Sequence, residues 1–346
     1  MGLPTFSSLS RIFLGTVTIG IASAAGLLYV YQRALIYPSS FPDGSRTIVD
    51  TPDKYDLPFS EYRLNTPDGQ KLHVYAILQA GVDGDKSDMS VAKERPTVLM
   101  LHANAGNMGH RLPLAVVFYR RMGCNVVMLS YRGYGLSTGE PSEMGLRIDA
   151  QTMLDWMRAH PVISQTSVVA YGQSVGGAVA IDLAARNPRS IRALIIENTF
   201  LSIPQLIPSV LPMLAPFTFL CRENWPSFQM IPKIPATMPV LFLSGADDEI
   251  VPPSHMKELD RLCVSERKEF HLFPGANHNE TCIKPNYFDI IAAFLLKYVI
   301  DADDLRDASE KSPRTDPLEY SEDADDSDWV KMRASDADME KSKTKL

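Results

Sequence analysis

The chain is poor in the patterns that mark metal-binding and repeat proteins. Its 346 residues include only four cysteines, Cys124, Cys221, Cys263 and Cys282, and none of them forms a C-x-x-C pair. This wide spacing argues against a zinc site. It is compatible either with four free thiols or with one disulfide. No sequence repeat of about 20–50 residues occurs, which excludes solenoid and propeller architectures.

Most of the chain also lacks an excess of charge of one sign. Residues 1–300 carry 26 acidic and 26 basic side chains, whereas residues 301–346 carry 15 acidic and 8 basic ones and hold the whole net charge of −7. A balanced body does not favour nucleic acid, so we expect no nucleic-acid partner. Residues 301–346 have no hydrophobic periodicity and are predicted to be a disordered tail. A regulatory role for the tail is the alternative, with the protein partner unknown.

One long apolar run lies near the N-terminus. Ile12–Tyr31 contains no charged side chain and is bracketed by Arg11 and Arg33. At about 1.5 Å per residue, a helix of this length crosses a hydrocarbon core of roughly 30 Å. Residues 1–33 are therefore predicted to be a signal anchor that crosses a membrane once. A signal peptide cleaved near Ala22-Ser23-Ala24 is the alternative, and the single arginine on each side leaves the orientation open.

Residues 34–300 alternate between strand-like and helix-like patterns. Eight strands are predicted, at Tyr62–Asn65, Leu72–Gln79, Thr97–Leu101, Asn125–Ser130, Val168–Tyr171, Ile191–Glu197, Val240–Ser244 and Lys268–Phe273. Helices are predicted at Arg111–Arg121, Gly145–His160, Val175–Arg186, Met256–Leu262 and Asn286–Val299, and a surface loop at Gly81–Arg95. This alternation predicts an α/β fold, with a mostly parallel central sheet and helices on both faces.

Residues 199–239 interrupt this alternation. They contain 8 of the 25 prolines, and Pro204, Pro208, Pro212 and Pro216 are spaced by four with apolar residues between them. Proline at this density prevents one long helix. We therefore expect a cap insertion of short helical turns that covers the sheet.

The strongest catalytic motif is the G-x-S-x-G sequence at Gly172–Gly176. An apolar strand precedes it and an alanine-rich helix follows it. In such a strand-to-helix elbow the turn exposes the serine hydroxyl, and side chains at the glycine positions would clash. The context predicts Ser174 as a nucleophile, rather than an incidental serine in a glycine-rich turn.

Two later strand ends carry the groups that could activate this serine. Asp247 and Asp248 follow the seventh predicted strand, and the G-x-x-D-x-x-V-P spacing favours Asp248 over Asp247 as the carboxylate that orients a histidine. His278 follows the last strand, where an imidazole can accept the serine proton and pass it on. The order Ser174, Asp248, His278 predicts the catalytic triad of a serine hydrolase.

An oxyanion hole is expected beside the nucleophile, because backbone N–H groups must meet the charge that develops on the carbonyl oxygen. One donor is expected from Val175. The other is expected from the loop after the Thr97–Leu101 strand, where Asn104 is preferred and Ala103 is the next choice. No metal site is expected.

These motifs resemble those of a known family. The segments that carry the resemblance are His102–Pro113 (HANAGNMGHRLP), Ser130–Gly139 (SYRGYGLSTG), Tyr171–Gly177 (YGQSVGG) and Asn277–Asn279 (NHN). They are similar to signatures of membrane-anchored α/β-hydrolase-domain proteins, including the fungal Bem-type members, and the resemblance spans about Gln32–Val299 together with the anchor. Ala103 stands where the family usually has glycine, which narrows the space at the oxyanion loop but leaves a backbone donor.

The resemblance implies an α/β-hydrolase fold and hydrolysis of an ester or thioester without a cofactor. The substrate class that it implies is a lipid or an acylated protein, as for a lipase or a protein depalmitoylase, at the endoplasmic reticulum or another endomembrane. The apolar cap and the anchor are compatible with an acyl chain delivered from a bilayer. The alternatives are a non-catalytic membrane scaffold or adaptor that kept the fold, and a serine hydrolase of soluble non-lipid substrates.

Overall fold

The structure is a computed structural model that describes residues 6–80 and 89–300. The predicted acidic tail, residues 301–346, lies outside these residues, and so does much of the predicted loop Gly81–Arg95. The described end of that loop is a short helix, α2 (Ser90–Glu94), so the loop prediction is wrong there. Tertiary contact explains the helix, because Ala92 is buried and its carbonyl accepts a hydrogen bond from Asn125 Nδ2 at 2.8 Å.

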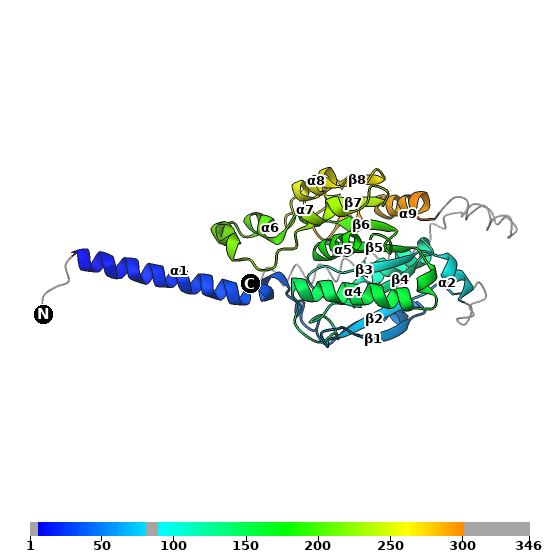
Figure 1. The fold of residues 1–346 in the computed structure, drawn as a ribbon, viewed down its shortest axis with the longest axis horizontal. Coiled ribbons are helices and arrows are strands. Elements are labelled where there is room, and N and C mark those ends of the chain that lie inside the picture. The colour runs from blue at the N-terminus through cyan, green and yellow to red at the C-terminus, as the bar shows by residue number, and fades with distance from the viewer. Residues whose placement is uncertain (1–5, 81–88, 301–346) are drawn as a thin grey trace.

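Eight strands form one sheet at the centre of the described fold (Figure 1). They are β1 (Ser60–Asn65), β2 (Lys71–Ile77), β3 (Thr97–Leu101), β4 (Asn125–Ser130), β5 (Val168–Gln173), β6 (Ala193–Glu197), β7 (Val240–Gly245) and β8 (Lys268–Phe273). Their order is β1-β2-β4-β3-β5-β6-β7-β8. β2 runs antiparallel to both of its neighbours, β1 and β4, and every other neighbouring pair is parallel, so the predicted mostly parallel α/β sheet is confirmed.

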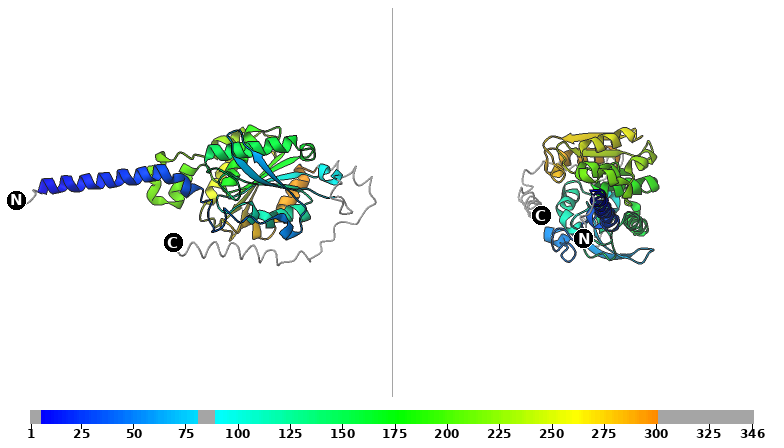
Figure 2. Two further views of the ribbon diagram at one scale, coloured as in Figure 1. Left: turned by 90° about the horizontal axis from the view of Figure 1, so that it is seen from below. Right: turned by 90° about the vertical axis from the view of Figure 1, so that its left-hand side faces the viewer.

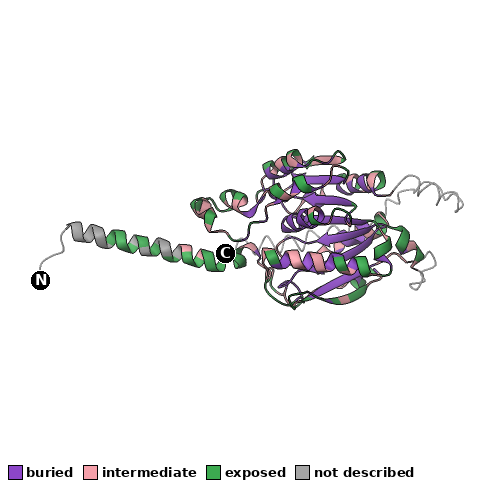
Figure 3. Ribbon diagram, viewed as in Figure 1, coloured by how far each residue is buried: buried purple, intermediate pink, exposed green. Residues whose placement is uncertain are grey.

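Helices cover both faces of this sheet. α4 (Glu143–Ala159), α5 (Val175–Arg186) and α8 (Pro253–Leu262) pack on one face, and α3 (Leu112–Val116) and α9 (Tyr287–Tyr298) pack on the other. The inner strands, β2 to β7, are buried from both sides (Figure 3), which explains why they appear in the sequence as largely apolar runs.

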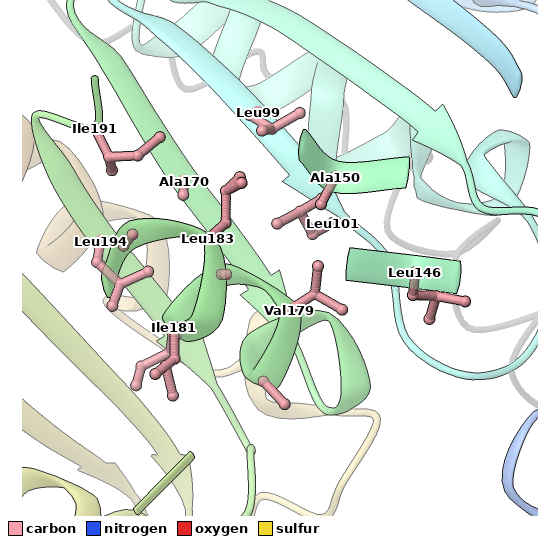
Figure 4. Packing of buried hydrophobic residues seen from close by; sticks show 14 of the residues in the cluster. Leu99, Leu101, Leu146, Ala150, Ala170, Val179, Ile181, Leu183, Ile191 and Leu194 are labelled. Carbon is pink, nitrogen blue, oxygen red and sulfur yellow. The ribbon is translucent and has the colours of Figure 1, made fainter. Parts of the chain in front are cut away.

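Alternate residues of a strand supply the two cores. Leu99 and Leu101 of β3 pack against side chains of α4 and α5, such as Leu146 and Val179 (Figure 4). Their neighbours Val98 and Met100 belong instead to the core beneath α3 and α9. This period of two fixes the direction of each strand-end side chain as well.

The predicted helix Arg111–Arg121 is divided into three turns of different kinds. A 3₁₀ turn (Met108–Arg111) leads into α3, and a π-helical turn (Val117–Arg121) follows it. Proline at the second position of α3 is tolerated because the first-turn N–H groups have no partner within a helix.

The cap consists of short elements, as its prolines predict. They are α6 (Ile203–Val210), the 3₁₀ segment η5 (Pro212–Leu220), α7 (Ser227–Met230) and η6 (Ile231–Lys233). α6 and η5 each have proline in their first turn. Proline is favourable at the start of a helix, and it also prevents a preceding helix from continuing through it.

The N-terminal apolar run lies within one helix, α1 (Phe6–Ile36). Its C-terminal end lies beside the cap, and the rest extends away from the sheet (Figures 1 and 2). In the described part of the chain, no helix reaches the combination of length and apolar character required for crossing a membrane.

Candidate active site

Ser174 occupies a sharp turn between β5 and α5. Its φ of 54° lies in the left-handed region, which residues other than glycine seldom adopt. A Cβ at Gly172 would lie 2.2 Å from the carbonyl oxygen of Gly176, and a Cβ at Gly176 would lie 2.0 Å from that of Leu101. The two glycines are therefore sterically required, and the second one brings the start of α5 against the end of β3.

The strained serine is held by its backbone from two sides. Its N–H donates to the carbonyl of Glu197 at 2.9 Å, and its carbonyl accepts from Thr199 Oγ1 at 2.7 Å. Both partners come from the end of β6, the neighbouring strand. Such bonds maintain a conformation that costs about 1–3 kcal/mol on its own.

His278 and Asp248 lie close to this serine although they are distant in sequence. His278 Nε2 lies 3.1 Å from Ser174 Oγ, and His278 Nδ1 lies 2.8 Å from Asp248 Oδ2. All three side chains are buried, with residue exposures of 5–6 %. They follow β5, β7 and β8, whose carboxyl ends share one edge of the sheet because these strands are parallel.

The geometry distinguishes between the two adjacent aspartates. Asp248 is the residue whose carboxylate contacts His278, and its other oxygen accepts the N–H groups of Ile250 and Val251 at 2.9 and 2.7 Å. Asp247 is exposed to solvent. Two backbone donors therefore fix the Asp248 carboxylate in the orientation that meets the imidazole.

Asn198 holds the histidine loop and was not identified from the sequence. Its Nδ2 donates to the carbonyl of His278 at 3.0 Å, while its Oδ1 accepts the Gly245 N–H at 2.8 Å. Its φ of 45° is left-handed, like that of Ser174. An asparagine directly after an apolar strand was the available signal, since asparagine tolerates this region better than most residues.

Glu197 is a buried carboxylate beneath the nucleophile, also missed at the sequence level. Its side chain accepts hydrogen bonds from Tyr171 and Tyr287 at 2.6 and 2.5 Å. Burial raises the pKa of this carboxyl, an effect that the two hydroxyl donors oppose. A charged residue at the end of an otherwise apolar strand was the signal that marked it.

The two expected oxyanion donors lie on segments that the structure brings together. Among the backbone hydrogen bonds of the described residues, none uses the N–H of Val175 or Asn104. The Asn104 carbonyl accepts from Tyr134 Oη at 2.8 Å, and its Nδ2 donates to the carbonyl of Ile36 at 3.2 Å. The loop is thus held by contacts that leave its N–H group available.

A small cavity lies between the strand ends and α3. Its lining includes His102 and Gln173, the neighbours in sequence of Ala103 and Ser174. His102 Nε2 and Gln173 Oε1 are buried there without a hydrogen-bond partner among the described residues. The cavity therefore offers a polar donor or acceptor close to the nucleophile.

None of the four cysteines, all of which lie in the described part of the chain, forms a disulfide. Cys124, Cys263 and Cys282 are buried, and Cys221 is partly buried in the cap. Burial raises the pKa of the Cys124 thiol to about 12, so this group is a neutral core residue at physiological pH.

Comparison with known proteins agrees with this architecture. Residues 96–213 match the family described as "alpha/beta hydrolase fold". The chain is 50% identical to protein bem46 of Schizosaccharomyces pombe over 273 residues, which cover 79% of this chain and 88% of that protein. It is 40% identical to the uncharacterized membrane protein YNL320W of Saccharomyces cerevisiae, with 83% and 97% covered. The alpha/beta hydrolase domain-containing protein WAV2 of Arabidopsis thaliana is 36% identical, with 84% and 95% covered.

Solved structures share the fold at low sequence identity. The Pyrococcus furiosus esterase Pf2001 superimposes with a TM-score of 0.58 at 17% identity, covering 73% of this chain and 96% of that one. An alpha-beta hydrolase from Vibrio vulnificus gives 0.62 at 19% identity, with 77% and 92% covered. The sheet order, the glycine-flanked serine elbow, the family match and the extent of identity with WAV2 together show that this chain belongs to the α/β-hydrolase family.

Proposed function

We propose that the chain is a membrane-attached serine hydrolase that cleaves an ester or thioester of a lipid or an acylated protein. The observation that carries the proposal is the hydrogen-bonded series from Asp248 through His278 to Ser174, with distances of 2.8 and 3.1 Å. Both distances are within the range of ordinary hydrogen bonds. The members of this series have the relative positions that nucleophile, base and orienting carboxylate require.

In the first half of the reaction an acyl group is transferred to the enzyme. Ser174 Oγ forms a bond to the acyl carbon while its proton moves to His278 Nε2. The carbonyl oxygen becomes an oxyanion, which the N–H groups of Val175 and Asn104 are assigned to stabilise. Collapse of this intermediate breaks the bond to the alcohol or thiol, which leaves with the proton from His278.

In the second half water releases the acyl group. His278 Nε2 takes a proton from the water as its oxygen bonds to the acyl carbon, and Ser174 Oγ leaves with that proton. Asp248 accepts the His278 Nδ1–H throughout, which orients the ring and stabilises its charged form. Water alone completes the cycle, so the reaction requires no cofactor.

Membrane attachment is assigned to α1. Phe13, Leu14, Leu27 and Val30 on this helix are each more than 60% exposed, a surface that suits hydrocarbon better than water. The Saccharomyces relative, 40% identical to this chain, is named as a membrane protein. Both observations support an acyl substrate that arrives from a bilayer.

The nucleophile assignment is tested with an alkyl fluorophosphonate probe on the full chain. We expect the wild-type chain to be labelled and Ser174→Ala to remain unlabelled, because the probe reacts with an activated serine hydroxyl. Ser209→Ala, at an exposed serine of the cap, is the matched control and should label normally. Labelling that persists in Ser174→Ala would contradict the assignment.

The same measurements separate the other candidate functions. A scaffold or adaptor without catalysis predicts no labelling of the wild-type chain. A hydrolase of soluble substrates predicts labelling together with a preference for acetyl over long-chain esters.

A further inference from the structure

An apolar groove runs between α1 and the cap. Its empty volume, which includes space open to the solvent, is about 500 Å³. α1 and η5, its two walls, lie side by side in both views of Figure 2. The lining residues are Leu28, Gln32, Leu35, Ile36, Ile207, Leu211, Leu214, Phe217, Leu220 and Cys221.

The two polar side chains of the lining are engaged by the protein itself. Gln32 Nε2 donates to the carbonyl of Leu220 at 3.2 Å, and its Oε1 accepts the N–H of Arg222 at 2.6 Å. The Cys221 thiol lies 3.1 Å from the carbonyl of Glu223. A ligand in the groove therefore meets carbon atoms and is offered no unused polar group by these two residues.

A polar network holds the two walls of the groove in place. Glu223, which is 2% exposed, pairs with Arg33 of α1 at 2.7 Å. Its other oxygen accepts from Tyr37 Oη at 2.9 Å, and Trp225 Nε1 donates to the same hydroxyl at 2.8 Å. The groove is thus built by specific contacts between α1 and the cap.

The inner end of the groove reaches the proposed oxyanion loop. The carbonyl of Ile36, a lining residue, accepts the hydrogen bond from Asn104 Nδ2. Ile36 and Ile207 also pack against the core cluster on the α4 and α5 side of the sheet. Leu28, at the outer end, is eight residues or about 12 Å further along α1, in the direction of its exposed apolar surface.

We propose that this groove binds the acyl chain of the substrate, so that the N-terminal helix forms one wall of the substrate site as well as the membrane attachment. The inference rests on the proposed function and extends it to a site for one hydrocarbon chain. The chain lies between α1 and η5, with its carbonyl at Asn104 and its methyl end toward Leu28. A peptide is a poorer occupant, because its backbone N–H and C=O groups would lack partners against this lining.

The test compares kcat/KM of the full chain in detergent micelles on p-nitrophenyl acetate and p-nitrophenyl palmitate. Leu28→Trp fills the outer end of the groove and Leu214→Trp narrows it from the cap side. Each should lower kcat/KM for the palmitate ester by more than about tenfold, since the loss of contact with even one methylene has an effect of that size. Hydrolysis of the acetate ester should stay within about twofold, because its acyl group ends near Ser174.

Each variant has a control at an exposed apolar residue outside the groove. Leu296→Trp and Met213→Trp add comparable bulk at positions that are 53% and 88% exposed and do not line the groove. Both controls should keep the wild-type ratio of palmitate to acetate hydrolysis. An unchanged ratio in Leu28→Trp and Leu214→Trp, with acetate hydrolysis intact, would overturn the proposal.

A binding measurement keeps this inference separate from the proposed function. A wild-type chain that hydrolyses neither ester would contradict the proposed function, but binding of an acyl chain in the groove could still be measured. In the Ser174→Ala chain, a palmitoyl ester with a diazirine at its terminal carbon should cross-link to peptides that contain Leu28 or Leu214. Adducts that are absent from these peptides, or equally frequent over the rest of the chain, would refute the groove as an acyl site. Because this experiment does not use the tryptophan variants, it tests the groove even if those variants fail to fold.

Discussion

At the scale of single residues, two of the five non-glycine residues with positive φ in the described chain lie at the active site. Ser174 and Asn198, at the ends of neighbouring strands, both have a left-handed backbone without being glycine. Each is held by hydrogen bonds to other strand ends, through Thr199 for the serine and Gly245 for the asparagine. Strain that is maintained in this way is typical of functional sites, where it presents a group in a fixed direction.

The difference between the adjacent aspartates leads to a prediction at this scale. Asp248→Asn should lower kcat for ester hydrolysis by about 10³–10⁴-fold, because an amide cannot fix the His278 tautomer that accepts the serine proton. Asp247→Asn changes an exposed side chain and should leave kcat within about twofold. The measurement is steady-state hydrolysis of p-nitrophenyl acetate by both variants.

Two results would contradict this assignment. One is a loss of activity in Asp247→Asn that equals the loss in Asp248→Asn. The other is an Asp248→Asn variant with wild-type kcat.

At the scale of elements, the contact between α1 and the cap is the unusual feature of the fold. Arg33, which the sequence indicates only as a charge at the end of an apolar run, is ion-paired with the buried Glu223. The same carboxylate accepts a hydrogen bond from Tyr37, and burial, together with the nearby Glu223 charge, raises the pKa of that phenol. These bonds connect an N-terminal helix to a segment about 190 residues away in the chain.

Removal of the charge at Glu223 should loosen this contact. In Glu223→Gln the Arg33 guanidinium loses its ionic partner and Tyr37 loses a charged acceptor, so we expect the free energy of unfolding to fall by about 1–3 kcal/mol. Proteolytic cleavage between α1 and β1 should become faster as well. Thermal unfolding and limited trypsin digestion of the full chain measure both effects.

The matched control is Glu258→Gln in α8. Glu258 also pairs with an arginine, Arg261, but that pair is exposed at the surface. Exposed pairs contribute little to stability, so this variant should unfold and be digested as the wild-type chain does. Equal behaviour of the two variants would mean that Glu223 does not hold α1 to the cap.

At the scale of the whole molecule, the sheet order determines where the site lies. From β3 the chain continues to β4 on one side, and β5 is added on the other side of β3. Crevices at such a switch point, at the carboxyl ends of parallel strands, are the usual ligand sites of open α/β sheets. Ser174 follows β5 and Asn104 follows β3, so both flank this switch point.

The proposed membrane attachment is a prediction for the whole chain. The full chain should remain with the membrane fraction after alkaline carbonate extraction. A chain that begins at residue 25 keeps Leu28 and Ile36 of the groove but loses Phe13 and Leu14, and it should move to the soluble fraction. Immunoblotting of both fractions measures the distribution. Full extraction of the intact chain, or equal retention of the shortened one, would speak against attachment through α1.

Much of the fold could be predicted because its signals are local. The apolar runs of β3 and β4 and the helix Val175–Arg186 are predicted within a few residues of their observed bounds. The prediction is poorer at Ser90–Glu94 and Val117–Arg121. Their helical turns depend on tertiary contact, or on a backbone irregularity that the side-chain pattern does not reveal.

The sequence by itself determined that Ser174, an aspartate and His278 each follow a strand, because strand period, glycine turns and chain order are properties of neighbouring residues. The G-x-x-D-x-x-V-P spacing also favoured Asp248 over Asp247. Only the tertiary structure decided that Asn198 holds the histidine loop and that α1 forms a wall of the apolar groove. These features depend on side-chain direction and on contacts between segments up to about 190 residues apart. Hydrophobic patterning carries no record of such contacts, because it reports which face of an element is buried and not which partner covers it.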